Sequence, residues 1–178
     1  MQLSAFTPDH AEEVIKLFTS VFSDSEGKDE GAVIGALVRE MINSTPPEEL
    51  QGFMAKEDNQ TIGAIFYSRF TLPSNKVAFI LSPVAVSTGV QGKGVGQQLI
   101  RFGIKAMKAQ GVEILLTYGD PNYYSKTGFQ QITETLIPAP LELSFPHGWL
   151  AQSLTGKEIT PEVGNTSCVS ALNHQKYW

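Results

Sequence analysis

The stretch VAVSTGVQGKGVGQQLI, residues 84–100, carries the pattern that decides the fold. A run rich in β-branched residues passes through a glycine-rich turn directly into a segment with apolar residues at helical spacing. A strand, turn and helix in this order aim backbone N–H groups and the positive end of the helix at one point, where phosphate oxygens bind. We therefore predict an anion cradle at this turn.

Two common phosphate-binding patterns do not fit the turn. A Walker A loop needs glycine where Ser87 stands, and Ser or Thr where Gly94 stands. A dinucleotide fingerprint needs its third glycine at a position that holds Gln97 or Leu99, depending on where it begins. The turn therefore belongs to another class of phosphate site.

Outward from the turn, hydrophobic spacing predicts alternating strands and helices. Before it we expect strands at 1–6, 53–58, 61–70 and 77–87, helices at 11–22 and 32–42, and a polar loop at 23–31. After it we expect a helix at 95–110 capped by Gly111, a strand at 112–119, a short helix or turn at 121–128 and a strand at 129–137. The tail from Pro138 predicts late strands or an extended cover at 143–154 and 166–172.

Composition sets wide limits on the class of protein. The chain has 178 residues, 42% of them hydrophobic and 17% charged, which predicts one well-cored domain and excludes intrinsic disorder. No apolar run is long enough for a membrane helix, no signal peptide is visible, and the single cysteine, Cys168, favours a reducing compartment, so we expect a cytoplasmic protein. The net charge is −5, yet no acid occurs between Asp58 and Glu113, which favours a small anionic ligand over nucleic acid.

Two motifs carry a resemblance to a known family. Gln91, Gly94 and Gly96 fit Q-x-x-G-x-G, and residues 119–129 read GDPNYYSKTGF. Together they resemble the GNAT superfamily of N-acetyltransferases, and in particular a bacterial branch with a GDPxYYxxxGF element. The resemblance covers roughly residues 1–133.

The resemblance implies an α/β GNAT fold. Its sheet is mixed and mostly antiparallel, has one V-shaped splay for the cofactor, and is flanked by helices. We expect a single domain over residues 1–178, with an N-terminal strand and two helices in 1–50, an acetyl-CoA-binding core in 51–133 and C-terminal strands or cover in 134–178.

The resemblance also implies how acetyl-CoA is held. Its pantetheine arm would pair with main-chain groups of the strand before the turn, at Val84 and Val86. Its pyrophosphate would bind the backbone N–H groups of Gln91, Gly92, Lys93, Gly94, Val95 and Gly96. Lys93, and less strongly Arg101 or Lys105, would face the adenosine phosphate.

By the same resemblance, Tyr124 is the general acid that protonates the departing thiolate. Many members carry a glutamate on or near the strand before the glycine turn as the base, but VAFILSPVAVS, residues 77–87, contains no acid. The base therefore stays open among Glu26, Asp29, Glu30, His147 and water. Three dispersed histidines predict no metal site, and Cys168 is expected to pack in a strand rather than act as a nucleophile.

The function that follows is acetyl transfer from acetyl-CoA to a primary amine of a small molecule or peptide, by direct attack in a ternary complex. The alternative is a non-catalytic acyl-CoA-binding or regulatory module on the same fold. The acceptor, the use of another acyl group and the oligomeric state stay open, and the apolar tail makes a homodimer worth testing. We expect neither nucleic acid nor a membrane as partner.

Overall fold

The computed structural model describes all residues from 1 to 178. The chain forms two compact units, one made of Met1–Tyr67 and Pro83–Gly103, the other of Ser68–Ser82 and Ile104–Trp178. Strands β3 and β4 and helix α3 contribute residues to both.

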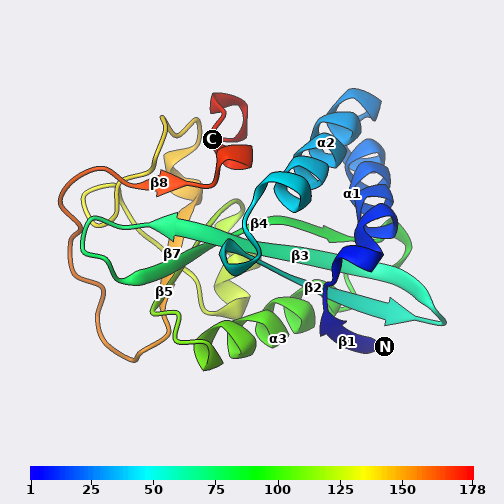
Figure 1. Cartoon of the computed structure of the whole chain (residues 1–178), viewed down its shortest axis with the longest axis horizontal. Helices are drawn as coiled ribbons and strands as arrows, with labels where there is room; N and C mark the ends of the chain where they lie inside the picture. The colour runs from blue at the N-terminus through cyan, green and yellow to red at the C-terminus, as the bar shows by residue number, and fades with distance from the viewer. The chain divides into compact units, whose positions relative to one another are not determined.

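Figure 1 shows the course of the chain through its helices and strands. The helices are α1 (Ala11–Glu26), α2 (Lys28–Ser44), α3 (Val95–Ala109) and α4 (Pro121–Tyr124). The strands are β1 (Gln2–Ala5), β2 (Leu50–Glu57), β3 (Gln60–Thr71), β4 (Val77–Val86), β5 (Ile114–Tyr118), β6 (Gln130–Gln131), β7 (Trp149–Ser153) and β8 (Ser167–Cys168). Hydrogen bonds order the strands β1-β2-β3-β4-β5-β7-β6, and β8 pairs with β3.

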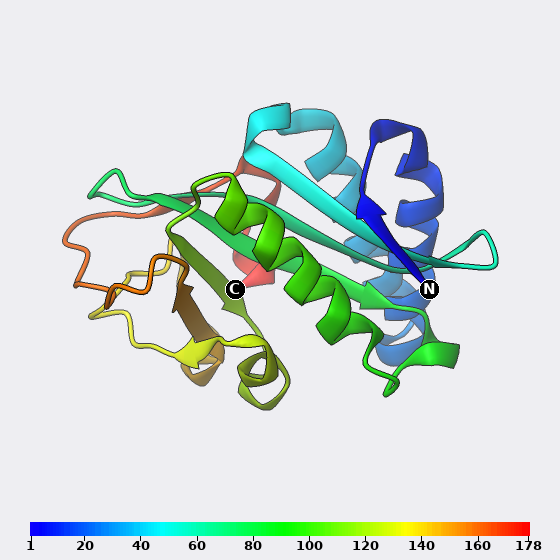
Figure 2. The same ribbon diagram turned by 90° about the horizontal axis from the view of Figure 1, so that it is seen from below.

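In the first unit, side-chain alternation along β3 separates two faces of the strands. Phe66 points to the α1 side, where its ring lies 6.0 Å from that of Phe18. Tyr67 points the other way and donates its hydroxyl to the Ile100 carbonyl of α3 at 3.1 Å. Figures 1 and 2 show the same arrangement, with α1 and α2 over one face and the first part of α3 over the other. Both faces of this part of the sheet are therefore covered by helices.

The predicted polar loop at 23–31 is wrong, because α1 runs to Glu26 and α2 begins at Lys28. Gly27 alone joins them, at φ +98°, a conformation that favours glycine. Two further glycines let the helices approach closely. A Cβ at Gly31 would lie 1.9 Å from Oγ of Ser23, and one at Gly35 would lie 2.2 Å from Oγ1 of Thr19. The charged residues of the expected loop are therefore helical.

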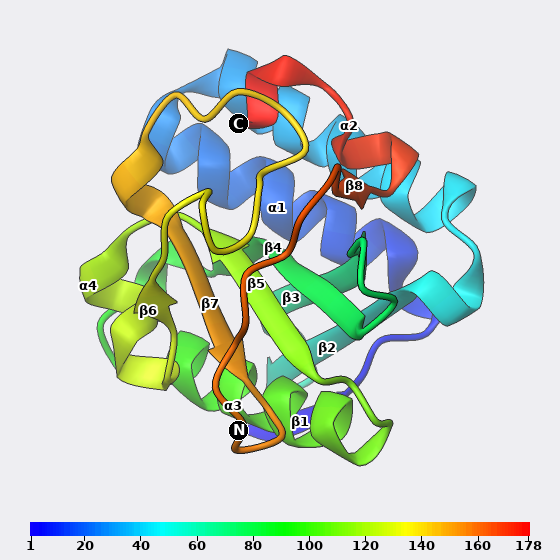
Figure 3. The ribbon, with the colours of Figure 1, turned by 90° about the vertical axis from the view of Figure 1, so that its left-hand side faces the viewer.

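In the second unit, β4 and β5 form a parallel ladder that runs from Ala78–Ile114 to Leu81–Thr117. Strand β7 pairs antiparallel with β5 and with the short β6, as Figure 3 shows. The predicted strand at 129–137 is mostly wrong, because only Gln130–Gln131 pairs and the chain then turns away. The expected mixed, mostly antiparallel sheet with helices on its faces is confirmed.

The core of this unit is aromatic. Trp149 is fully buried, and its ring lies between 5.9 and 6.4 Å from those of Phe70, Tyr118 and Trp178. The C-terminal residue, Trp178, donates its indole N–H to the Leu172 carbonyl at 2.8 Å. The tail from Pro138 therefore packs into the core, with short strands only at β7 and β8. No helix of the chain is both long and apolar enough to cross a membrane.

Candidate active site

The turn between β4 and α3 lies in the first unit and is closed by several hydrogen bonds, among them one from the Gln91 N–H to the Thr88 carbonyl at 3.4 Å and one from the Thr88 hydroxyl to the Asp24 carboxylate at 2.8 Å. The Ser87 N–H donates to the Ile62 carbonyl at 2.8 Å, and the Val90 N–H donates to the Ser87 carbonyl at 3.0 Å. The Gln91 side chain donates Nε2–H to the Val86 carbonyl at 2.9 Å. The Gln91 side chain thus folds back onto the strand and stabilises the turn that carries the glycines.

The glycines of this turn open a row of backbone N–H groups. Gly92 and Gly94 have φ values of +76° and +83°, which L side chains adopt only with strain. The first helical bond is donated by Gln98 to the Gly94 carbonyl at 3.0 Å, so the N–H groups of residues 92–97 have no backbone partner. Gly92 is exposed and a Cβ there would meet nothing within 4 Å. Unpaired N–H groups at the start of a long helix form a site suited to an anion.

Strand β4 stops pairing with β5 before it reaches the turn. Its last registered pair with β5 is Leu81–Thr117, where the Thr117 hydroxyl donates to the Leu81 carbonyl at 2.9 Å. Pro83 follows and has no N–H to give to a ladder. Val84 and Val86 are half-buried and alternate with the buried Ala85. The parallel ladder therefore stops well before the strand ends, as a splayed pair requires.

The predicted cations lie along the turn and the outer side of α3. Lys93 is exposed at the turn, and Arg101 and Lys105 are exposed on the helix. All the predicted cofactor residues, from Val84 to Gly96, thus fall in one short segment of the first unit.

Tyr124 lies in the second unit, at the end of α4. The Asp120 carboxylate accepts the Asn122 N–H at 2.9 Å and caps this helix. The Tyr124 ring packs edge-on against Phe129, with ring centres 6.0 Å apart. Burial raises the pKa of the Tyr124 phenol well above its usual range, and the neighbouring Tyr123 raises it further. The phenol is therefore protonated at physiological pH and has a proton to give.

A close contact that the sequence did not reveal fixes the place of this ring. A Cβ at Gly119 would lie 2.7 Å from Cε2 of Tyr124, so only glycine leaves room for the ring. Gly119 also donates its N–H to the Gly148 carbonyl at 2.9 Å, and a Cβ at Gly148 would lie 2.8 Å from the Gly119 carbonyl. Gly119 stands in the quoted GDP element, but nothing in the sequence pairs it with Gly148.

The predicted base candidates are divided between the two units. Glu26 ends α1, and Asp29 and Glu30 lie in the first turn of α2, so all three are helical rather than in a loop. His147 lies in the second unit, in a single 3-10 turn formed by Pro146–Gly148, and is exposed.

The structure supports neither a cysteine nucleophile nor a metal site. Cys168 is half-buried in β8, and burial raises the pKa of its thiol to about 11, which disfavours the reactive thiolate. The structure brings no three His, Cys, Asp or Glu side chains into a group that would hold a metal ion.

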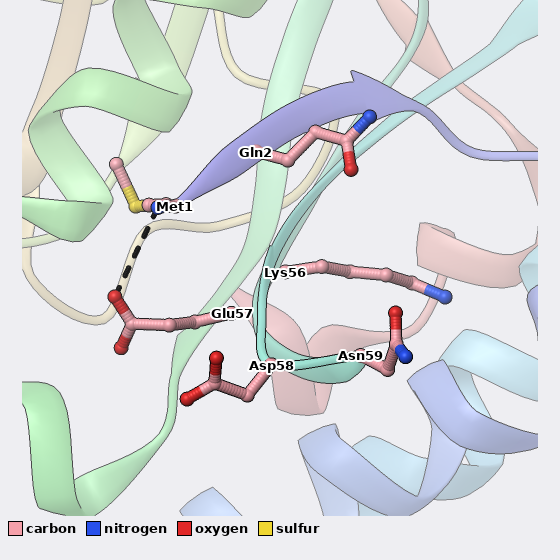
Figure 4. A pocket seen from close by; sticks show the side chains of 6 residues that line it. All are labelled: Met1, Gln2, Lys56, Glu57, Asp58 and Asn59. Carbon is pink, nitrogen blue, oxygen red and sulfur yellow. Dashed lines mark ion pairs between the residues drawn. The ribbon is translucent and has the colours of Figure 1, made fainter.

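A shallow hollow at the edge of the first unit contains none of the predicted site residues. It is lined by Met1, Gln2, Lys56, Glu57, Asp58 and Asn59. Figure 4 shows that Lys56 and Glu57 point in different directions from β2. Glu57 lies 3.9 Å from the terminal amine, and Lys56 donates to Glu13 at 2.8 Å, so two of the charged side chains of the hollow are used in local ion pairs.

Comparisons with known proteins agree on one family. Residues 48–131 match the family model described as acetyltransferase (GNAT) domain. The chain is 29% identical over 130 residues to the uncharacterized N-acetyltransferase YjhQ of Escherichia coli, which covers 70% of this chain and 72% of that protein.

Solved structures share the fold. The GNAT family N-acetyltransferase YhbS from Escherichia coli, in complex with CoA, superposes with a TM-score of 0.82 at 20% identity, covering 97% of this chain and 92% of that one. A GNAT family acetyltransferase from Brucella melitensis, in complex with acetyl-CoA, gives a TM-score of 0.70 at 22% identity and 97% coverage of both chains.

Proposed function

The chain is a GNAT N-acetyltransferase, and from this premise we propose that it transfers the acetyl group of acetyl-CoA to a primary amine. The observation that carries the proposal is the row of unpaired backbone N–H groups at residues 92–97, which suits a pyrophosphate. Two structural relatives crystallised with CoA or acetyl-CoA support the choice of co-substrate.

In this proposal β4 and the turn bind the cofactor. The main chain at Val84 and Val86 pairs with the pantetheine arm, and the unpaired N–H groups from Gly92 to Gly96 bind the pyrophosphate, while the Gln91 N–H, also expected there, is held by the Thr88 carbonyl. The Gln91 side chain is bonded to the Val86 carbonyl and the Gln91 N–H to the Thr88 carbonyl at 3.4 Å, so we assign Gln91 the shaping of the turn and leave ligand contact to the residues that follow it. Lys93 is free to approach a phosphate.

The chemical step is direct attack within a ternary complex. The neutral amine attacks the thioester carbonyl carbon, the C–S bond breaks, and Tyr124 gives its proton to the departing sulfur. The phenol is protonated at neutral pH, and the fixed position of its ring against Gly119 and Phe129 supports this role, whereas the raised pKa by itself makes the phenol a weaker acid. The half-buried Cys168, whose thiol has a raised pKa, disfavours a covalent acetyl-enzyme.

Calorimetric titration of acetyl-CoA into the wild type and the Gly94→Glu variant tests the proposal. A glutamate at φ +83° strains the turn and puts a negative charge among the N–H groups, so we expect binding by the wild type and none by the folded variant. Gly94→Asn is the matched control, because asparagine tolerates this backbone conformation and adds no charge, and it should keep part of the affinity. No binding by the wild type, or equal binding by Gly94→Glu, would refute the assignment of the cradle.

Tyr124→Phe separates the enzyme from a binding module. We expect this variant to bind acetyl-CoA as the wild type does and to lose about 10²-fold or more in kcat with the best amine of a screened panel. An unchanged kcat would remove Tyr124 from the mechanism.

A further inference from the structure

The segment Ser144–Gly148 lies at the end of β5, and its backbone is held on every side. The Phe145 N–H donates to the Tyr118 hydroxyl at 2.6 Å, and the Gly148 N–H donates to the Phe145 carbonyl at 2.9 Å. The Gln131 side chain donates to the His147 carbonyl at 2.8 Å. Two side chains from β5 and β6 thus fix the main chain around one residue, His147.

The ring of His147 is free, in contrast to its backbone. The side chain is exposed, its only ring neighbour is Phe145 at 5.8 Å between centres, and neither ring nitrogen has a hydrogen-bond partner. Among the side chains that are hydrogen-bonded to this segment, one is titratable, Tyr118, whose hydroxyl accepts the Phe145 N–H and bonds to the Ser144 hydroxyl. A fixed backbone with a free imidazole is the arrangement that a proton acceptor needs.

Backbone contacts join this segment to Tyr124. His147 precedes Gly148, whose carbonyl accepts the Gly119 N–H at 2.9 Å, and Gly119 lies directly against the Tyr124 ring. Figure 3 shows α4 and the start of β7, which Gly148 precedes, at the same end of β5. The main chain next to His147 is therefore linked through Gly119 to the position of the Tyr124 ring.

Most carboxylates of the second unit already accept a hydrogen bond from the backbone. Each of four accepts a backbone N–H at between 2.9 and 3.1 Å, namely Glu113, Asp120, Glu134 and Glu162. The remaining two, Glu142 and Glu158, are exposed. Strand β4 contains no acid at all. Among these groups, the imidazole is the type of side chain that serves most often as a general base.

We propose that His147 is the general base of the reaction, an inference that rests on the proposed acetyl transfer. Its unprotonated ring nitrogen takes a proton from the acceptor ammonium, and the resulting neutral amine attacks the thioester carbonyl carbon. Tyr124 protonates the departing sulfur and recovers a proton from the new amide nitrogen. The proton on His147 passes to water, so the products are the acetamide, CoA thiol and one proton.

The test measures kcat/KM against pH for the wild type, His147→Ala and His147→Gln. The acceptor is whichever of benzylamine, spermidine and glycinamide the wild type acetylates fastest. We expect His147→Ala to lose about 10²-fold at pH 7, with its acid limb displaced toward the pKa of the amine, and free imidazole to restore part of the rate. His147 is exposed, so the fold and the affinity for acetyl-CoA should not change.

His174→Ala is the matched control, because His174 is an exposed histidine of the same unit whose ring packs on Tyr177. It should keep the wild-type profile. A wild-type profile in His147→Ala would overturn the inference, as would an equal loss in Glu142→Gln or Glu158→Gln. A wild type that binds acetyl-CoA but acetylates none of these amines would count against the proposed acceptor class and, with it, against the role of His147.

Discussion

Gly119→Ala should disable catalysis without touching the cofactor cradle. The new Cβ would lie 2.7 Å from Cε2 of Tyr124, 3.5 Å from Cδ2 and 3.7 Å from Cζ. Carbon atoms in contact prefer a separation of about 3.5 Å or more, so the ring must move by about 0.8 Å. A displacement of about 1 Å at a reacting group costs about 10²-fold in rate.

The variant should therefore show kcat reduced about 10²-fold, with an unchanged dissociation constant for acetyl-CoA. Overpacking of this kind also costs about 1–3 kcal/mol of stability, so urea unfolding is measured beside the kinetics to show that the variant is folded under assay conditions.

A double-mutant cycle with Tyr124→Phe isolates the cause. If Gly119→Ala acts by moving the Tyr124 hydroxyl, it should cost little in a background that already lacks this hydroxyl. A full additional loss in that background would refute the reasoning, and so would a folded Gly119→Ala variant with wild-type kcat.

Two further predictions concern stability. The hydrogen bond from Lys56 lowers the pKa of Glu13, so the ionised carboxylate stabilises the fold above the unfolded-state pKa, and this contribution is lost as the pH falls through the folded-state pKa. Lys56→Met should lower the free energy of unfolding by under about 1 kcal/mol at pH 7, and the difference from the wild type in urea unfolding should be smaller at pH 3. An equal difference at both pH values would contradict the link between Glu13 ionisation and stability. Glu162→Ala removes the acceptor for the N–H and hydroxyl of Ser74, and urea unfolding should show a free energy of unfolding lower by about 1–3 kcal/mol. Glu162→Gln keeps an acceptor oxygen and should lose less. Equal losses in the two variants would show that side-chain volume, rather than hydrogen bonding, stabilises this position.

Elements with long periodic patterns were predictable from the sequence, and the two main errors have physical causes. The segment 23–31 is polar and contains two glycines, which predicted a loop, yet Gly31 is helical because it packs against Thr19 and Ser23. The run 129–137 was predicted as a strand from its apolar and β-branched residues, but pairing with β7 ends after Gln131. Tertiary packing decided both cases, and hydrophobic spacing does not report it.

The candidate site also has a part that could be predicted from the sequence and a part that could not. The strand, turn and helix that form the proposed cradle could be predicted because this pattern is local in sequence, and both Gly92 and Gly94 have a positive φ; the binding role of the turn stays a prediction. The contact between Gly119 and Gly148 behind the Tyr124 ring could not be predicted, because these two glycines lie far apart in the chain and meet only when β5 pairs with β7. The identification of the family from short motifs is confirmed by the comparisons, while the roles of single residues await the variants described above.

The single-residue connection at Gly27 has an evolutionary consequence. Helices α1 and α2 meet with no spare chain, and Gly31 and Gly35 hold their axes so close that even a methyl group collides with the neighbouring helix. Insertions, the usual way in which loops diversify, would have to break this packing before they offered new surface. The hairpin should therefore diverge among descendants of this chain through exchange of its outward-facing side chains, at constant length.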